Sequence, residues 1–195
     1  MKLTILGSGT SQGIPVIACD CPVCRSADDK RLRASAMLDI KGKKIIIDAG
    51  PDFRYQMLRS QVKDLRAILL THGHKDHIGG LDDVRAFNWV KQGAVDVYGN
   101  EGTREVVYKD FSYAFAAFRY PGVPEINYHV IDDRPFYIDD IQVVPIPVLH
   151  YKMPVLGFRI GNFAYITDAK TIPASSMERL KGVEYLVINA LRKEL

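Results

Sequence analysis

The stretch Thr71-His-Gly-His-Lys-Asp-His-Ile-Gly-Gly80 gathers the side chains of this sequence that are best suited to chemistry. Its four candidate metal ligands lie within six positions: His72, His74, Asp76 and His77. Residues two apart in an extended segment point to the same side, so His72 and His74 can bind one ion. Asp76 and His77 follow a turn and can reach a second ion nearby. Imidazole and carboxylate ligands together suit zinc, manganese or iron.

All three cysteines lie in a second short stretch, Cys19-Asp-Cys-Pro-Val-Cys24. The N-terminus has no signal-peptide pattern, and no run approaches the roughly 20 apolar residues of a membrane helix. We therefore expect a cytoplasmic protein without a membrane partner. Thiols stay reduced in that compartment, so the cluster favours a metal site over a disulfide. Buried thiols that bind nothing are the alternative interpretation.

The composition predicts one domain that spans residues 1–195. The chain is 47% hydrophobic, which is enough for a sizeable single core. Its net charge of +3 does not indicate a nucleic-acid partner.

Short apolar runs alternate with turn residues along the chain. They predict helices at 53–60, 81–90 and 101–118, and strands at 2–6, 34–40, 43–47, 65–71, 95–98, 128–131, 141–148, 157–160, 164–167 and 184–188. Because adjacent strands occur early and again late, two packed sheets with helices outside are favoured. Asp48, His150 and Asp168 each end a predicted strand. His129 lies in a strand without a motif, and we interpret it as structural.

The His-x-His-x-Asp-His pattern resembles the signature of the metallo-β-lactamase-fold hydrolases. Asp48 in "IIIDAG", His150 in "VVPIPVLH" and Asp168 in "FAYITDA" resemble further motif residues of that family. The resemblance implies an α+β fold, an αββα sandwich of two mixed sheets flanked by helices. It implies a two-metal site whose ligands are His72, His74 and His150 for the first ion, and Asp76, His77 and Asp168 for the second. Asp168 would be shared, and Asp48 would orient the metal loop without binding metal.

Three segments resemble the PhnP-type phosphodiesterases, which open cyclic ribose phosphates: "LGSGTSQGIPVIACDCPVC", "DAGPDFRYQML" and "LTHGHKDHIGGLDDVR". This resemblance implies hydrolysis of small, cyclic phosphodiesters by a metal-bound hydroxide, with Asp76 and Asp168 as catalytic carboxylates. It also implies one structural zinc held by Cys19, Cys21 and Cys24. A homodimer is left open.

The family pattern includes further histidines after His150, for the second ion and for the cysteine zinc, and this sequence has none there. We therefore expect the C-terminal part of the fold to be missing after Leu195, and catalysis by the 195-residue form to be impaired. Two alternatives stay open. One is another hydrolase of the same fold, acting on tRNA 3′ ends or thioesters. The absence of a basic protruding arm argues against tRNA. The other is a non-catalytic metal-binding protein of cofactor biosynthesis.

Overall fold

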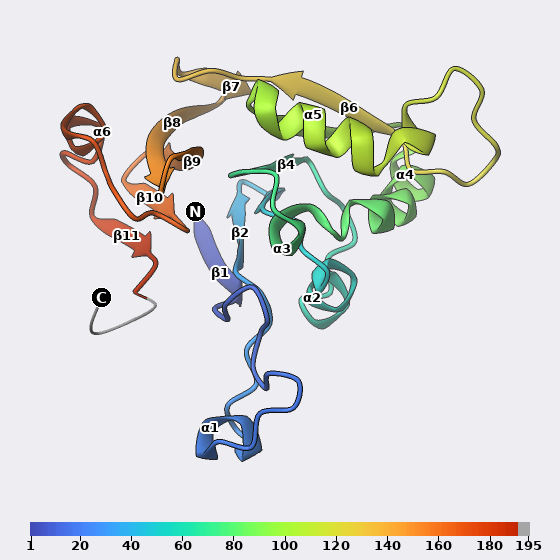
Figure 1. Cartoon of the computed structure of the whole chain (residues 1–195). Coiled ribbons are helices and arrows are strands. Elements are labelled where there is room, and N and C mark those ends of the chain that lie inside the picture. Colours follow the sequence, from blue (N-terminus) through green and yellow to red (C-terminus); the bar gives the residue numbers. More distant parts are fainter. Residues whose placement is uncertain (191–195) are drawn as a thin grey trace.

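The computed structural model describes residues 1–190, and it consists of two packed β-sheets with helices on both outer faces (Figure 1). The first sheet has six strands in the order β1 (Lys2–Gly7), β2 (Ser35–Ile40), β3 (Lys43–Ile47), β4 (Ala67–Leu69), β5 (Val95–Gly99) and β6 (Ile126–Val130). The second has five, in the order β11 (Tyr185–Ile188), β10 (Phe163–Ile166), β9 (Met153–Ile160), β8 (Ile141–His150) and β7 (Phe136–Ile138). Both sheets mix parallel and antiparallel pairs, which confirms the predicted αββα sandwich.

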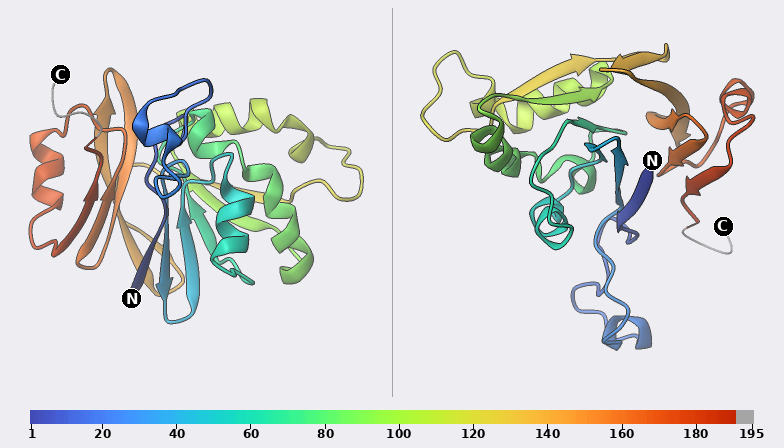
Figure 2. Two further views of the ribbon diagram at one scale, coloured as in Figure 1. Left: turned by 90° about the horizontal axis from the view of Figure 1, so that it is seen from below. Right: turned by 180° about the vertical axis from the view of Figure 1, so that it is seen from behind.

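Strand β3 shows how the layers form. Side chains alternate along a strand, so Ile45 and Ile47 point into the core between the sheets while Ile46 points to the outer face. That outer face is covered by α2 (Phe53–Arg59), α3 (Lys75–Ile78), the 3-10 helix η1 (Leu81–Val84), α4 (Arg85–Lys91) and α5 (Glu101–Asp110). The left view of Figure 2 shows the layers side by side, with the second sheet next to the first and the helices outside them.

Helix α6 (Ala174–Arg179) lies on the opposite face of the molecule, against the second sheet (Figure 1). Its Ser176 hydroxyl donates to the carbonyl of Pro147 in β8. Leu180, just after the helix, packs against a buried apolar cluster that includes Ile146, Val148 and Val155. The loop that carries α1 (Pro22–Arg25) projects away from the sandwich. No helix among residues 1–190 is long and apolar enough to span a bilayer.

The strand directions bring distant segments to one edge of the sandwich. Strands β3 and β4 are parallel neighbours, so the segments after Ile47 and Leu69 emerge side by side. Strand β9 is antiparallel to both β8 and β10, so the ends of those two strands also emerge together. The amide of Leu156 in β9 donates to the carbonyl of Thr71 at 2.9 Å, which joins the two sheets at this edge.

Several predicted elements differ from the structure. The predicted helix 101–118 ends at Asp110 and is followed by the 3-10 helix η2 (Ser112–Ala114). Phe111 and Ala114 are buried, and the Tyr113 hydroxyl donates to Asp82 at 2.6 Å, so tertiary contacts outweigh helix propensity. The predicted strand 65–71 shortens to β4, and α1, α3, α6 and β7 were not predicted.

Candidate metal centre

The histidine motif begins just after β4 and turns into α3. His74 is the N-cap of α3, so Asp76 and His77 lie within the first turn of that helix. His72 and His77 are buried, whereas His74 is exposed at the mouth of the site. The ring of His72 lies 4.6 Å from that of His74 and 4.2 Å from that of His77, measured between centroids. One short segment therefore presents three imidazoles to the same point.

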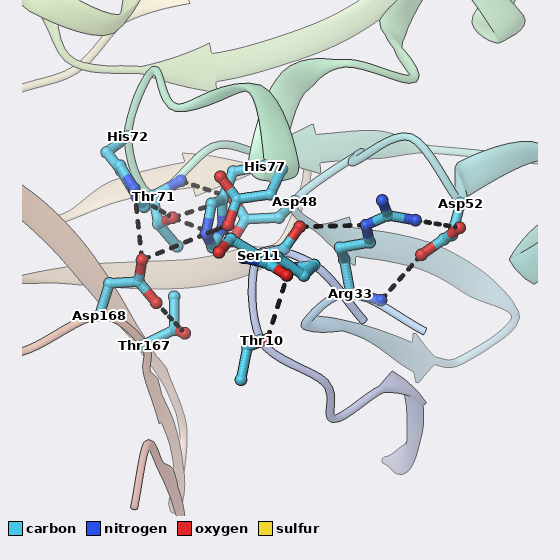
Figure 3. Close-up of polar contacts among 12 residues, drawn as sticks. Thr10, Ser11, Arg33, Asp48, Asp52, Thr71, His72, His77, Thr167 and Asp168 are labelled. Atoms are coloured by element: carbon cyan, nitrogen blue, oxygen red, sulfur yellow. Dashed lines mark hydrogen bonds and ion pairs between the residues drawn. The ribbon is translucent and has the colours of Figure 1, made fainter. Parts of the chain in front are cut away.

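Asp168 comes from the second sheet and completes two sets of possible ligands. His72, His74 and Asp168 form one set, and Asp76, His77 and Asp168 form the other, each with its ligand atoms within 4.8 Å of one another. The Nε2 atom of His77 lies 3.4 Å from Asp168 Oδ2, and Figure 3 shows Asp168 facing His72 and His77.

His150, at the end of β8, closes the site on one side. Its ring centroid lies 5.5 Å from that of His74 and 6.2 Å from that of His72. The structure thus brings together all six predicted ligands, and their assignment to two ions stays a prediction.

Asp48 is fully buried behind the motif and has a left-handed backbone, with φ +63°. Its carboxylate accepts hydrogen bonds from the Thr71 amide at 2.8 Å and from His77 Nδ1–H at 2.7 Å. Because Nδ1 is engaged, Nε2 of His77 is the atom that points at Asp76 and Asp168. Asp48 orients a predicted ligand without entering the site, as a second-layer carboxylate does at metal histidines.

Thr71 links Asp48 to His72, a role that the sequence did not reveal. Its hydroxyl has one proton, which the carboxylate of Asp48 accepts at 2.9 Å. The 3.0 Å contact from Thr71 Oγ1 to His72 Nδ1 must therefore use a proton on the imidazole. This leaves a lone pair on Nε2 of His72, aimed into the site. A hydroxyl residue at a strand end carries no spacing signal, so sequence reasoning could not single it out.

Burial and charge set the protonation of these groups. Burial and the neighbouring His77 charge lower the pKa of His72 to about 3, so His72 is neutral at pH 7. Burial disfavours the charged form of His77, but three carboxylates outweigh it and raise its pKa to about 12. Burial opposes ionisation of Asp168 too, yet the contact with His77 holds its pKa well below the usual range. Without metal, His77 is protonated, and its Nε2–H lies beside the carboxylates of Asp76 and Asp168.

The donor set fits divalent cations. The Nε2 atom of His72 is buried and finds no hydrogen-bond partner within residues 1–190, and its neighbouring carboxylate oxygen is 3.6 Å away. A buried polar atom without a partner is costly, and a cation would satisfy it. Histidine nitrogens mixed with carboxylate oxygens are ligands for zinc or manganese.

A clamp outside the site holds its supporting loops. The Arg33 guanidinium donates to Asp52 Oδ1 at 3.1 Å and to the Ser11 carbonyl at 3.2 Å (Figure 3). Asp52 stands at the start of α2, just after Gly50. A Cβ at Gly50 would lie 2.0 Å from the carbonyl oxygen of Asp76, so the loop packs directly beneath the motif helix.

The three cysteines also come together, in the projecting loop at α1. The Sγ atoms of Cys19, Cys21 and Cys24 lie within 4.8 Å of one another. Cys21 is the N-cap of α1, and the hydrogen bond from the Cys24 backbone N–H lowers the pKa of the Cys21 thiol. Cys24 is buried and accepts from the Val16 amide at 3.4 Å. Three thiols at this spacing could supply three of the four ligands of a structural zinc.

His129 lies elsewhere, on β6. Its Nε2 lies 2.9 Å from Asp96, and its ring stacks on Tyr98 at 4.5 Å. It is not part of the metal centre.

Comparisons with known proteins agree with this geometry. Residues 43–195 match the family described as "Beta-lactamase superfamily domain". A solved diphosphatase of the PhnP family is 43% identical, with a TM-score of 0.87, and the match covers 94% of this chain and 71% of that one. Zinc-bound PqqB from Methylobacterium extorquens is 22% identical over 97% of this chain and 73% of that one, with a TM-score of 0.76, and shares the fold.

Two curated proteins match part of their own length. The octanoyltransferase of Porphyromonas gingivalis is 43% identical over 98% of this chain but only 39% of that protein. The ribonuclease Z of Nostoc punctiforme is 29% identical over 83% of this chain and 47% of that protein. The chain thus spans less than half the length of these curated relatives. Since both the superfamily match and the solved relative cover most of the chain, the protein belongs to the metallo-β-lactamase superfamily and, within it, to the PhnP family.

Proposed function

We propose that this chain binds two divalent metal ions and hydrolyses small phosphodiesters, cyclic ones among them. The observation that carries the proposal is the place of Asp168 in both ligand sets. A carboxylate shared between two ions suits a pair about 3.5–4 Å apart, the arrangement used for in-line displacement at phosphorus. The likeness to a PhnP-family diphosphatase supports hydrolysis at phosphorus.

The bound ions would supply an activated water and neutralise the charge on the phosphate oxygens. The side chains His72, His74 and His150 would hold one ion, and Asp76, His77 and Asp168 the other. His72 offers the lone pair of Nε2 because its Nδ1–H donates a hydrogen bond to the Thr71 hydroxyl oxygen. Asp48 holds the His77 ring in place, so little reorganisation is needed when charge develops on the substrate.

The test uses the 195-residue protein loaded with Zn²⁺ or Mn²⁺ and bis-p-nitrophenyl phosphate as substrate. We expect slow metal-dependent turnover, in keeping with the impaired catalysis expected of the 195-residue form. His74→Ala should abolish it, and His129→Ala should leave it unchanged, because His129 lies outside the site. Turnover that is unchanged in His74→Ala would reject the proposal.

The same preparation separates the rival functions. Hydrolysis of an acyl thioester or of tRNA 3′ ends, with no phosphodiester turnover, would assign the site to another reaction of this superfamily. Two bound ions per chain with no hydrolysis of any ester would indicate a metal-binding protein without catalysis.

A further inference from the structure

A tyrosine with an unfavourable backbone stands beside the metal centre. Tyr151 occupies the two-residue turn between β8 and β9, where His150 pairs with Met153. Its φ is +54°, a left-handed conformation that glycine and asparagine adopt far more readily than an aromatic residue. Its side chain is nevertheless 70% exposed, so burial of the ring does not offset this cost. Backbone strain of this kind clusters at functional sites.

The ring of Tyr151 continues the row of imidazoles. Its centroid lies 5.4 Å from that of His150, whose own centroid lies 5.5 Å from that of His74. The ammonium group of Lys170 lies over the Tyr151 ring, 5.5 Å from its centroid. An exposed aromatic face and a cation are therefore adjacent to the predicted metal ligands.

Backbone hydrogen bonds join the two segments that carry these side chains. The amide of Lys170 donates to the carbonyl of Leu149 at 2.8 Å, and the amide of Leu149 donates to Thr171 at 2.9 Å. The segment after Asp168 is thus fastened to the end of β8. The same contacts bring Lys170 next to the turn that carries Tyr151.

We propose that Tyr151 and Lys170 form a substrate subsite that binds a planar aromatic ester arm of the phosphodiester. The tyrosine ring would stack on that arm, and the lysine would attract the anionic phosphate toward the site. This inference rests on the proposed function and adds the substrate class, a phosphoester with an aromatic or base-like group next to phosphorus.

The experiment compares the binding of phenylphosphonate and methylphosphonate to the metal-loaded protein by calorimetry. We expect phenylphosphonate to bind about three- to tenfold more tightly. Tyr151→Asn should remove that preference and still fold, because asparagine tolerates φ +54°. Tyr151→Phe should keep it. Lys170→Met should weaken the binding of both ligands. Lys152→Met, which changes an exposed lysine in the turn that also carries Tyr151, should leave their binding unchanged.

The results separate the two proposals. An unchanged phenyl preference in Tyr151→Asn, or equal binding of both ligands by the wild type, overturns the subsite even where phosphodiesters are hydrolysed. A phenyl preference lost in Tyr151→Asn, in a protein that hydrolyses no phosphodiester, supports the subsite and overturns the reaction.

Discussion

The buried carboxylate of Asp48 and the Nδ1 atom of His77 are 2.7 Å apart, although the two residues follow different strands of the first sheet. This contact ties the end of β3 to the helix after β4. The amide of Ala49 reinforces it by donating to the His77 carbonyl at 2.8 Å. The metal motif is therefore positioned by a residue that lies outside it.

Replacing Asp48 by asparagine should leave the buried His77 charge without the nearest of its three carboxylates. We expect the free energy of unfolding to fall by roughly 3–5 kcal/mol, and metal affinity to fall about 10–100-fold because the His77 ring loses its orientation. Chemical denaturation and titration against a chromophoric chelator measure the two effects. Asp140→Asn is the control, since Asp140 pairs with Lys41 and Lys43 on the surface. Equal metal affinity in both variants would contradict the role of Asp48.

Thr71→Val keeps the side-chain shape but removes the hydroxyl between Asp48 and His72. The Nδ1–H of His72 would then lose its acceptor in a buried place, so the free energy of unfolding should drop by about 1–3 kcal/mol. Urea denaturation checks this, and Thr71→Ser should recover most of the loss. A valine variant as stable as the wild type would show that the hydroxyl is dispensable.

The stability of the metal-free protein should peak near pH 6.5. Folding lowers the pKa of His72 from 6.5 to about 3, so the unfolded chain binds the extra proton and stability falls as the pH drops below 6.5. Folding raises the pKa of His77 from 6.5 to about 12. The stabilisation from protonated His77 is therefore fully present below pH 6.5 and is lost as the pH rises. Each limb has a slope of about 1.4 kcal/mol per pH unit.

Urea denaturation with a chelator, from pH 4.5 to 9, measures this profile. His77→Gln should flatten the alkaline limb and leave the acid limb. A wild-type stability that keeps rising from pH 6.5 to 9 would be the opposite of the expected result.

His150→Asn should weaken metal binding, because the variant removes one predicted ligand of the first ion. His129→Asn provides a matched histidine change outside the site, on β6. We expect calorimetric zinc titration to show at least tenfold weaker binding for the first variant and wild-type binding for the second. Equal affinities would remove His150 from the ligand set.

Gly50→Ala should destabilise the protein, because its Cβ would meet the Asp76 carbonyl oxygen at 2.0 Å and force the motif helix to shift. Overpacking of this kind costs typically about 1–3 kcal/mol. Gly93→Ala is the control, since a Cβ there has no neighbour within 4 Å among the described residues. Gly50→Ala should have the lower melting temperature in thermal unfolding and the weaker zinc binding in titration. Equal melting temperatures of the two variants would contradict the packing argument.

His72, His74, Asp76 and His77 could be singled out from the residues alone, because four candidate ligands share one short segment. The roles of Asp48, His150 and Asp168 came from the family resemblance, because a single residue at a strand end does not by itself indicate a metal site. The contribution of Thr71 depends on which proton each hydrogen bond uses, and pattern does not encode that. The Arg33–Asp52 clamp joins residues 19 positions apart through a loop without periodicity.

The fold was predicted where periodicity is clear, as at Lys43–Ile47, and mistaken where tertiary contacts decide. The segment after Asp110 is aromatic and could continue a helix, but Tyr113 reaches Asp82 and Phe115 stacks on Tyr108 at 3.9 Å. Short elements such as α3 are too brief for a periodic signal and are defined by the turn at His74.

The centre is divided between the sheets, because the histidine motif follows β4 in the first sheet whereas His150 and Asp168 belong to the second. A chain cut between β6 and β7 would leave each fragment with an incomplete set of ligands. High-affinity metal uptake would then require both pieces to associate, which makes the centre a reporter of fragment complementation.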